Sequence, residues 1–537
     1  MSSLGRSTRG MAVGTVASRA TGFLRTAAIA AVLGVKGVGA AFNVANTTPN
    51  IVYELLLGGI LTSVLVPLLV QAAKTDADRG EAYAQRLLSL VIVGLAVASV
   101  LLVLLAPALV DLYMHSAPRN ERRLAVALSR FFLPQVLFYG AGAVLGAILN
   151  TRARFGAPMW APVLNNLVAI ATCLLFLALP GSSPLSAASI SDAQVLVLGV
   201  GTTLGIVAQT VVLLPALRST GFPLRLRTDL RGSGLRSVGR LSSWVLLYVA
   251  ANQVAFLVIV RLSNDRTLNQ AGRGYASYIN AFVLWQLPHA IVAVSVITAL
   301  LPRMSAAAVD GRFDELREIL NRGLRLTVSL LVPASVAYLV LGRVLATVVF
   351  AHLRTSVPEA QYIGTLLAVF AVGLVPFSAY QLQLRAFYAM QDTRTATLVN
   401  LGVNVTVVVV GVTLFAVLPA HLKVAGLVAG NSASFVAGLL LCSRVLSRRL
   451  GGLAGGSVVR TGARCLVASV VPGLLGAAVV AALGREVGDG PAGSLLSLLA
   501  GASVIGAGYL LLARRMRIAE ITEILDPLMA RLRPRRA

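Results

Sequence analysis

The 537-residue chain contains few charged side chains. Charged residues make up 12% of the sequence and hydrophobic residues 57%, whereas about 25% of residues are charged in a typical soluble domain. The mean hydropathy is +0.83. Apolar runs of about 20 residues recur along the chain, and each is long enough to cross about 30 Å of hydrocarbon. Soluble architectures are therefore excluded, and the sequence predicts an all-α polytopic membrane protein.

Residues that usually carry catalysis or bind metals are also scarce. The three cysteines all lie in or beside apolar runs, so neither a disulfide framework nor a zinc site is expected. The four histidines are scattered along the chain. The sequence contains no P-loop, no HExxH motif and no intramembrane pair of acids. We therefore expect no enzymatic activity, no catalytic residues, no metal and no cofactor.

Acidic residues are outnumbered by basic ones, 20 against 46, which gives a net charge of +26. The basic residues lie in short loops between apolar runs, and not on one soluble domain, so we expect no nucleic-acid partner. Cytoplasmic loops of membrane proteins are enriched in Lys and Arg, and this distribution predicts that both termini are cytoplasmic. The first apolar run lacks a small-residue cleavage site, so no cleavable signal peptide is expected.

About fourteen membrane spans are predicted from the apolar runs and their breaks. The second run is too long for one straight crossing, and Pro49 is expected to kink it. The spans lie near 11–33, 38–70, 86–111, 124–150, 157–180, 193–216, 238–261, 274–301, 323–349, 361–389, 396–417, 424–445, 464–484 and 493–513.

A basic loop at 218–240 divides the first twelve spans into two sets of six. Weak internal similarity, such as that between 66–90 and 301–326, supports two lobes around a central cavity, which is a transporter design. The predicted organisation is an N-terminal lobe (1–217), a cytoplasmic inter-lobe loop (218–240), a C-terminal lobe (241–450), two extra C-terminal spans (451–513) and a basic cytoplasmic tail (514–537). The tail serves as a topology signal or contacts anionic lipid.

Two arginines interrupt the first apolar run, in the segment SRATGFLR. Ser18, Gly22 and Arg25 follow an i, i+4, i+7 spacing and share one helix face, with Arg19 on the other side of Gly22. The two arginines differ by about 9 Å along the helix axis. Because guanidinium forks suit phosphate and carboxylate oxygens, the spacing predicts a clamp for one anionic group, with open space at Gly22.

Other interpretations of these charges remain open. Arg19 could extend to the inner membrane surface, and Arg25 could pair with Glu54. Glu54 is the only carboxylate well inside a predicted span; it could neutralise an arginine, help to release a substrate, or pack between the lobes. Arg130 either extends to the membrane surface or faces a cavity.

Three asparagines on the second span share one face by i, i+3, i+7 spacing, which favours a polar cavity. A single intramembrane asparagine more often forms an interhelical hydrogen bond. The candidate substrate-binding residues, all in the first two predicted spans, are Ser18, Arg19, Gly22, Arg25, Asn43, Asn46, Asn50 and Glu54.

Four segments follow one another along the chain: SRATGFLRTAAIAAVLGVKGVGAAFNVANTTPNIVYELLLGGILTSVLVPLL, GAILNTRARFGAPMWAPVLNN, ITALLPRMS and AFYAMQDTRT. In this order they resemble the MurJ (MviN) family of lipid II flippases, in the MOP exporter superfamily, and the similarity covers roughly the first 450 residues. The resemblance implies fourteen helices and alternating access in the bacterial plasma membrane. It also implies that Arg19 and Arg25 meet the pyrophosphate of lipid II, and that cell-wall synthesis proteins are candidate partners.

The chain departs from the family pattern at several positions. A further cavity arginine on the second span falls near Tyr53, and an acidic position before Ala-Phe is Ala40. The arginine expected on the eighth span falls near Val283, and its acidic neighbour near Gln286. These departures concentrate the anion-binding role on the first span. No acid for a sodium site is found in the second lobe, so sodium coupling is disfavoured.

The sequence thus predicts a lipid II flippase. Two alternatives stay open: a related exporter of another polyprenyl-linked glycan or a drug, and a non-transporting scaffold for cell-wall enzymes.

Overall fold

The structure, a computed structural model, describes residues 3–54, 69, 72, 76, 78, 80–152, 154–181, 184–225, 227, 229, 235–453 and 455–523. Nearly all of these residues are helical, and none of them forms a strand. The predicted all-helical membrane fold is therefore confirmed for the described part of the chain. The tail at 524–537 and most of 55–79 lie outside it.

Thirteen described segments are long and apolar enough to cross a membrane, and each matches one predicted span. One of the fourteen predicted spans, 38–70, has no counterpart among these segments. In that region α2 covers Val38–Tyr53, and residues 55–68 lie outside the described part. Pro49 lies inside α2. The second predicted span is thus covered only in its first half.

The chain divides into two compact units, Met1–Ala276 and Ser277–Ala537. The boundary between these units falls inside α13 and not in the predicted inter-lobe loop, so α11 belongs to the first unit. The division into lobes at 218–240 stays a prediction. The helices of unit 1 are α1 (Ser3–Leu33), α2 (Val38–Tyr53), α4 (Glu81–Leu104), α5 (Ala106–Tyr113), α6 (Arg119–Phe132), α7 (Gln135–Thr151), α8 (Gly156–Ala178), α9 (Asp192–Val211), α10 (Leu213–Arg218), α11 (Leu235–Ser263) and α12 (Arg266–Gln270).

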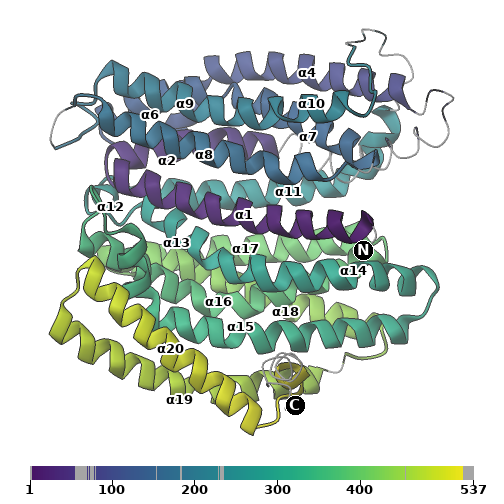
Figure 1. Cartoon of the computed structure of the whole chain (residues 1–537), viewed down its shortest axis with the longest axis vertical. Coiled ribbons are helices and arrows are strands. Elements are labelled where there is room, and N and C mark those ends of the chain that lie inside the picture. The colour runs from purple at the N-terminus through teal and green to yellow at the C-terminus, as the bar shows by residue number, and fades with distance from the viewer. Residues whose placement is uncertain are drawn as a thin grey trace, which may run out of the picture. The chain divides into compact units, whose positions relative to one another are not determined.

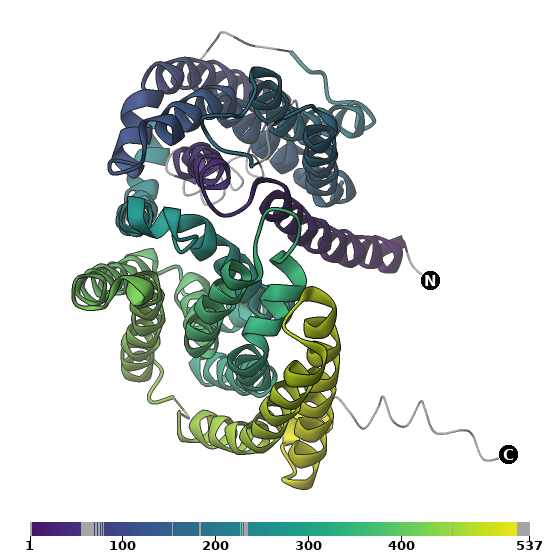
Figure 2. The same ribbon diagram turned by 90° about the vertical axis from the view of Figure 1, so that its left-hand side faces the viewer.

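Unit 2 contains the longest helices of the chain. In Figures 1 and 2 the long helices α15 and α16 lie side by side, and α19 and α20 form a pair. Its elements, counting the helix that begins just before the boundary, are α13 (Tyr275–Pro288), η3 (His289–Ala293), α14 (Val294–Val309), α15 (Phe313–Phe350), α16 (Val357–Ala389), α17 (Thr393–Val417), η4 (Ala420–Leu422), α18 (Lys423–Arg449), α19 (Gly455–Val487) and α20 (Pro491–Arg515).

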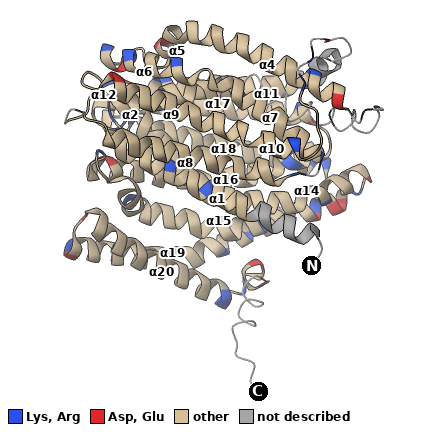
Figure 3. Ribbon diagram, turned by 45° about the horizontal axis from the view of Figure 1, so that its top comes forward, with Lys and Arg blue, Asp and Glu red and all other residues tan. Residues whose placement is uncertain are grey.

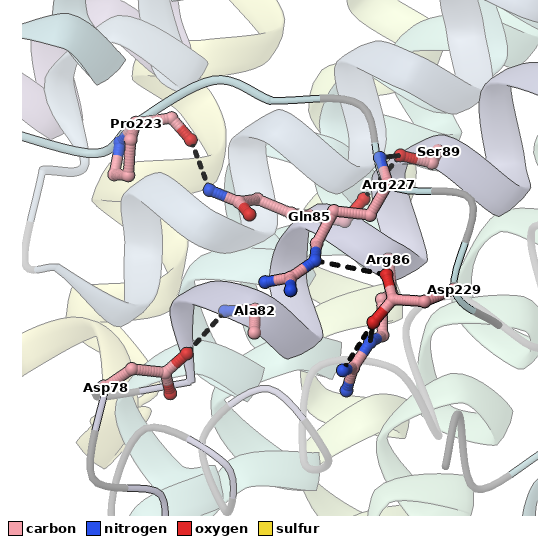
Figure 4. A network of polar contacts seen from close by, with 8 residues as sticks. All are labelled: Asp78, Ala82, Gln85, Arg86, Ser89, Pro223, Arg227 and Asp229. Carbon is pink, nitrogen blue, oxygen red and sulfur yellow. Dashed lines mark hydrogen bonds and ion pairs between the residues drawn. The ribbon is translucent and has the colours of Figure 1, made fainter. Parts of the chain in front are cut away.

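Within each unit, charged residues gather near the helix ends and the middles of the helices are mostly uncharged (Figure 3). At one end of unit 1, the segment after α10 lies against the start of α4. The Gln85 amide donates to the Pro223 carbonyl (2.5 Å), and the Arg227 backbone N–H donates to Ser89 Oγ (2.7 Å). Figure 4 shows the Asp229 carboxylate between two guanidinium groups.

Arg86 contributes the closer of these two pairs, through its Nε (3.0 Å) and Nη2 (2.7 Å) atoms. Its hydrogen bond is the main cause that holds the pKa of the Asp229 carboxyl below its usual range, and Arg227 adds to the effect. At the same end, Arg152 after α7 bonds to Glu81 (3.2 Å). The loops after α7 and α10 and the start of α4 therefore share one end of unit 1.

The opposite end of unit 1 gathers the other set of loops. Ser116 Oγ donates to the Asn264 carbonyl (3.5 Å), which joins the α5–α6 loop to the segment after α11. The Tyr275 hydroxyl bonds to Thr47 on α2 (2.8 Å). This alternation of loops between two ends is the arrangement that successive membrane crossings require.

In unit 2, polar contacts tie several helix ends together. Arg449 on α18 pairs with Asp392 before α17, and Arg325 on α15 pairs with Glu520 after α20 (2.8 Å). Arg322 pairs with Glu523 (3.2 Å). Asp392 also caps α17, because its Oδ1 atom accepts from the Thr395 backbone N–H (2.9 Å).

The Asp392 cap gives a pH-dependent contribution to stability. Burial raises the pKa of this carboxyl, but hydrogen bonds from Thr395 and the pair with Arg449 outweigh burial and lower the pKa overall. A carboxyl with a lowered folded pKa contributes stability above its unfolded pKa of about 3.9, and that stability is lost as pH falls through the folded pKa.

We therefore expect Asp392→Ala to destabilise the purified protein by about 1–2 kcal/mol at neutral pH, the usual cost of losing such a cap. The thermal midpoint in detergent, measured from pH 7 down to pH 3, checks this. The difference between variant and wild type should shrink at the acid end; a constant difference would contradict the titration.

Candidate functional site

The first helix packs along α8, and this contact sets the directions of its polar residues. The Asn166 amide on α8 donates to the Ser18 carbonyl (3.2 Å) and to Thr21 Oγ1 (3.0 Å). A Cβ atom at Gly22 would lie 3.4 Å from Asn166 Nδ2. The expected open space at Gly22 is therefore filled by Asn166, and Gly22 serves the approach of the two helices.

Arg25 points into a cavity inside unit 1. The cavity has a volume of about 130 Å³ and is lined by α1, α2, α7, α8 and α9. Its lining is rich in polar side chains: Arg25, Asn46, Asn50, Gln135, Tyr139, Asn165, Thr172 and Thr202. Arg25 is the only charged residue among the described residues that line it.

The Arg25 guanidinium carries an uncompensated charge near the middle of its span, Val13–Leu33. Its Nε atom is buried and has no hydrogen-bond partner in the described part of the chain. None of the ion pairs among those residues joins it to Glu54, which is exposed at the end of α2. Because an intramembrane charge costs about 2.5–3.5 kcal/mol on insertion scales, the cavity favours an anion.

Arg19 and Arg25 leave α1 on opposite sides of the contact with α8. The helical positions of Arg19 and Arg25 flank that of Gly22, whose face meets Asn166. Arg19 is exposed and does not line the cavity around Arg25. The described conformation thus brings one of the two predicted clamp residues into the cavity and leaves the other outside it.

The three predicted asparagines on α2 also separate. Asn46 and Asn50 line the cavity, and the Asn50 amide donates to the Asn46 carbonyl (3.1 Å). Asn43 is half-buried and bonds back to the Gly39 carbonyl of its own helix (2.8 Å). It is not among the residues that line the cavity.

Polar residues on α7, α8 and α9 were not predicted for this site. Gln135 on α7 is buried; its Nε2 atom donates to Thr203 Oγ1 (3.0 Å), and its Oε1 atom has no partner in the described residues. On α8, Asn165 and Thr172 follow an i, i+7 spacing and share the face that lines the cavity. This i, i+7 spacing is the signal from which these two residues could have been predicted.

In unit 2, the helix that lacks the expected arginine packs instead in an aromatic cluster. Trp285 is fully buried, and its ring stacks on Phe435 with centroids 5.5 Å apart. Phe282 lies 5.4 Å from Trp285. The neighbours of Val283 on α13 therefore serve packing. The charge at the cavity, among the described residues that line it, comes from Arg25 on α1.

Many crossing helices, a polar cavity inside one unit and an unpaired intramembrane arginine define a polytopic membrane transporter. The chain belongs to the lipid II flippase MurJ family, whose family model matches residues 29–499. It is accordingly a multi-pass protein of the bacterial inner membrane.

Curated relatives match the same region. The lipid II flippase MurJ of Burkholderia cenocepacia is 30% identical over 400 residues, which is 72% of this chain and 74% of the relative. The probable lipid II flippase MurJ of Rhizobium meliloti is 26% identical over 426 residues, or 78% and 76% of the two chains.

Solved structures share the fold at lower identity. A lipid II flippase MurJ in an inward closed conformation aligns with a TM-score of 0.72 and 18% identity, covering 94% of this chain and 99% of that one. An inward-facing multidrug resistance MATE family transporter of the MOP superfamily aligns with a TM-score of 0.64 and 16% identity, covering 80% and 94%. These likenesses support the transporter fold.

The role of Gly22 is testable by size. Gly22→Ala should keep near-normal stability, since a Cβ at 3.4 Å from Asn166 needs only a small adjustment. Gly22→Leu should displace the Asn166 amide and destabilise the protein by about 1–3 kcal/mol, as overpacking does. Thermal midpoints in detergent measure both. Equal midpoints for the two variants would contradict a close α1–α8 contact. Gly94→Leu, at an exposed glycine on α4 with no atom within 4 Å, is the matched control.

Proposed function

We propose that this chain carries lipid II from the cytoplasmic to the outer leaflet by alternating access. The observation that carries the proposal is Arg25, a permanently charged and unpaired side chain in a polar cavity lined by no acid in the described residues. Membership of the MurJ family supports lipid II as the substrate.

The diphosphate of lipid II is the group that Arg25 would bind. A cavity of about 130 Å³ has room for a small polar group, and not for a disaccharide-pentapeptide. The bulky headgroup would therefore lie outside it, and the isoprenoid tail would stay in the lipid. Arg19, exposed on the other side of the α8 contact, would meet the same substrate only in a different conformation.

Charge neutralisation supplies a reason for the conformational change. A ligand shifts an equilibrium only by as much as it binds one state better than the other. An anion that compensates Arg25 stabilises the conformation in which this guanidinium is buried, and its departure removes that stabilisation. No step of this cycle requires catalytic chemistry by the protein.

The orientation with both termini in the cytoplasm is part of the proposal. The loop at 218–240, which follows α10, holds six arginines in the sequence, and Arg152 in the loop after α7 lies at the same end of unit 1. Excess Lys and Arg favours the cytoplasmic side. The α5–α6 loop and the segment after α11 would then face outward.

Replacing the arginines tests the proposal in a strain depleted of its own flippase. Arg25→Ala should insert in the membrane but reduce lipid II accessible at the outer leaflet at least tenfold. Arg25→Lys should recover only part of the activity, because lysine keeps the charge but lacks the bidentate fork. Arg354→Gln, at an exposed arginine in the loop after α15, removes the same charge elsewhere and should be neutral.

Normal growth with both Arg19 and Arg25 replaced would overturn the assignment. Two further measurements separate the alternatives. An exporter of drugs should ignore competing lipid-linked pyrophosphate in a binding assay with purified protein. A scaffold that recruits cell-wall synthesis proteins predicts that lipid II still reaches the outer leaflet after rapid depletion of this chain.

A further inference from the structure

A second cluster of arginines lies on α6, away from the cavity around Arg25. Arg119, Arg122, Arg123 and Arg130 follow an i, i+3, i+4, i+11 spacing and share one helix face. Together with Asp111 on α5 they line a groove of about 420 Å³. The groove shares no lining residue with the Arg25 cavity.

The positive charge in this groove is only partly balanced. Arg122 pairs with Asp111, with Nε 2.9 Å from Oδ1. Asp111 is the only acid that lines the groove in the described part of the chain. Arg119, Arg123 and Arg130 are exposed, and no ion pair of the described residues includes them. Three guanidinium groups are thus free to bind an anion.

The length of the groove along α6 indicates the kind of anion. Arg119 stands at the start of α6, and Arg130 lies eleven residues further, a rise of about 16 Å at 1.5 Å per residue. Val126 and Ala127 form an apolar wall between them. A groove that descends from the loops into the span and combines cations with an apolar wall suits a molecule with both an anionic head and a hydrocarbon tail.

We propose that the groove between α5 and α6 binds the phosphate group of a membrane lipid in the leaflet at this end of unit 1. Arginine forks hold phosphate oxygens bidentately, and the tail lies along Val126 and Ala127. Arg130 then extends along its own helix toward the phosphate. This contact would explain why an arginine lies inside the fourth predicted span, 124–150. With the orientation proposed above, the leaflet at this end of unit 1 is the outer leaflet, and only that part of the proposal rests on the proposed function.

Lipid binding to the purified full-length chain, counted by native mass spectrometry, tests this site. The probes are phosphatidylglycerol, the zwitterionic phosphatidylcholine and undecaprenyl diphosphate. Wild type should bind an anionic lipid at least tenfold more tightly than the variant Arg119→Gln/Arg123→Gln/Arg130→Gln. The matched control Arg154→Gln/Arg218→Gln/Arg225→Gln removes three exposed arginines from the other end of unit 1 and should bind like wild type.

A bulky substitution at an apolar position tests the groove without changing its charge. Val126→Trp fills the groove without altering any arginine, and it should weaken binding by a similar factor if the protein elutes and melts normally. If phosphatidylglycerol binds more tightly than undecaprenyl diphosphate, the ligand of the groove is a phospholipid. If undecaprenyl diphosphate displaces bound phosphatidylglycerol, the ligand is a carrier lipid. Unchanged binding in both the triple variant and Val126→Trp would overturn the site. Because Arg25 is intact in these variants, that result leaves the transport assignment standing.

Discussion

The cost of holding a guanidinium group in the membrane without a carboxylate is the constraint on which this structure depends. Arg25 lies near the middle of the membrane span Val13–Leu33, and the cavity around it supplies only neutral polar side chains in the described part of the chain. Amides and hydroxyls solvate a cation but leave its charge in place. In the proposed function, the negative charge of the lipid II diphosphate compensates this guanidinium.

The contact between α1 and α8 determines what that charge can reach. Because Gly22 and Asn166 bring the two helices together, Arg25 is directed into unit 1 and Arg19 is left exposed. The same contact explains why α8, which carries no charge inside its span, contributes so much of the cavity wall. The packing of Gly22 against Asn166 thus determines which of the two arginines faces the cavity and which is exposed.

The sequence alone predicted the helical membrane fold, because apolar runs of bilayer length are a strong signal, and thirteen spans match. It also singled out Arg25, since a charge in such a run is rare; this residue lines the cavity, and its role in binding stays a prediction. It misjudged Gly22, because a glycine reads equally as open space and as a close helix contact. Gln135 and Thr202 escaped prediction for a different reason: single polar residues in apolar spans are common, and only the packing of α7 and α9 against the cavity distinguishes these.

The ion pairs of unit 2 differ in their sensitivity to salt. Arg325 with Glu520, Arg322 with Glu523 and Arg449 with Asp392 all fasten helix ends at one side of that bundle. The loop at 350–357, at the other ends of α15 and α16, takes part in no such pair among the described residues. Among the described residues, the ion pairs of unit 2 are therefore concentrated at one end of its helices. Salt screens exposed pairs more than partly buried ones. Raising the ionic strength therefore weakens Arg322–Glu523, whose two side chains are both exposed, before it weakens the partly buried pair Arg325–Glu520.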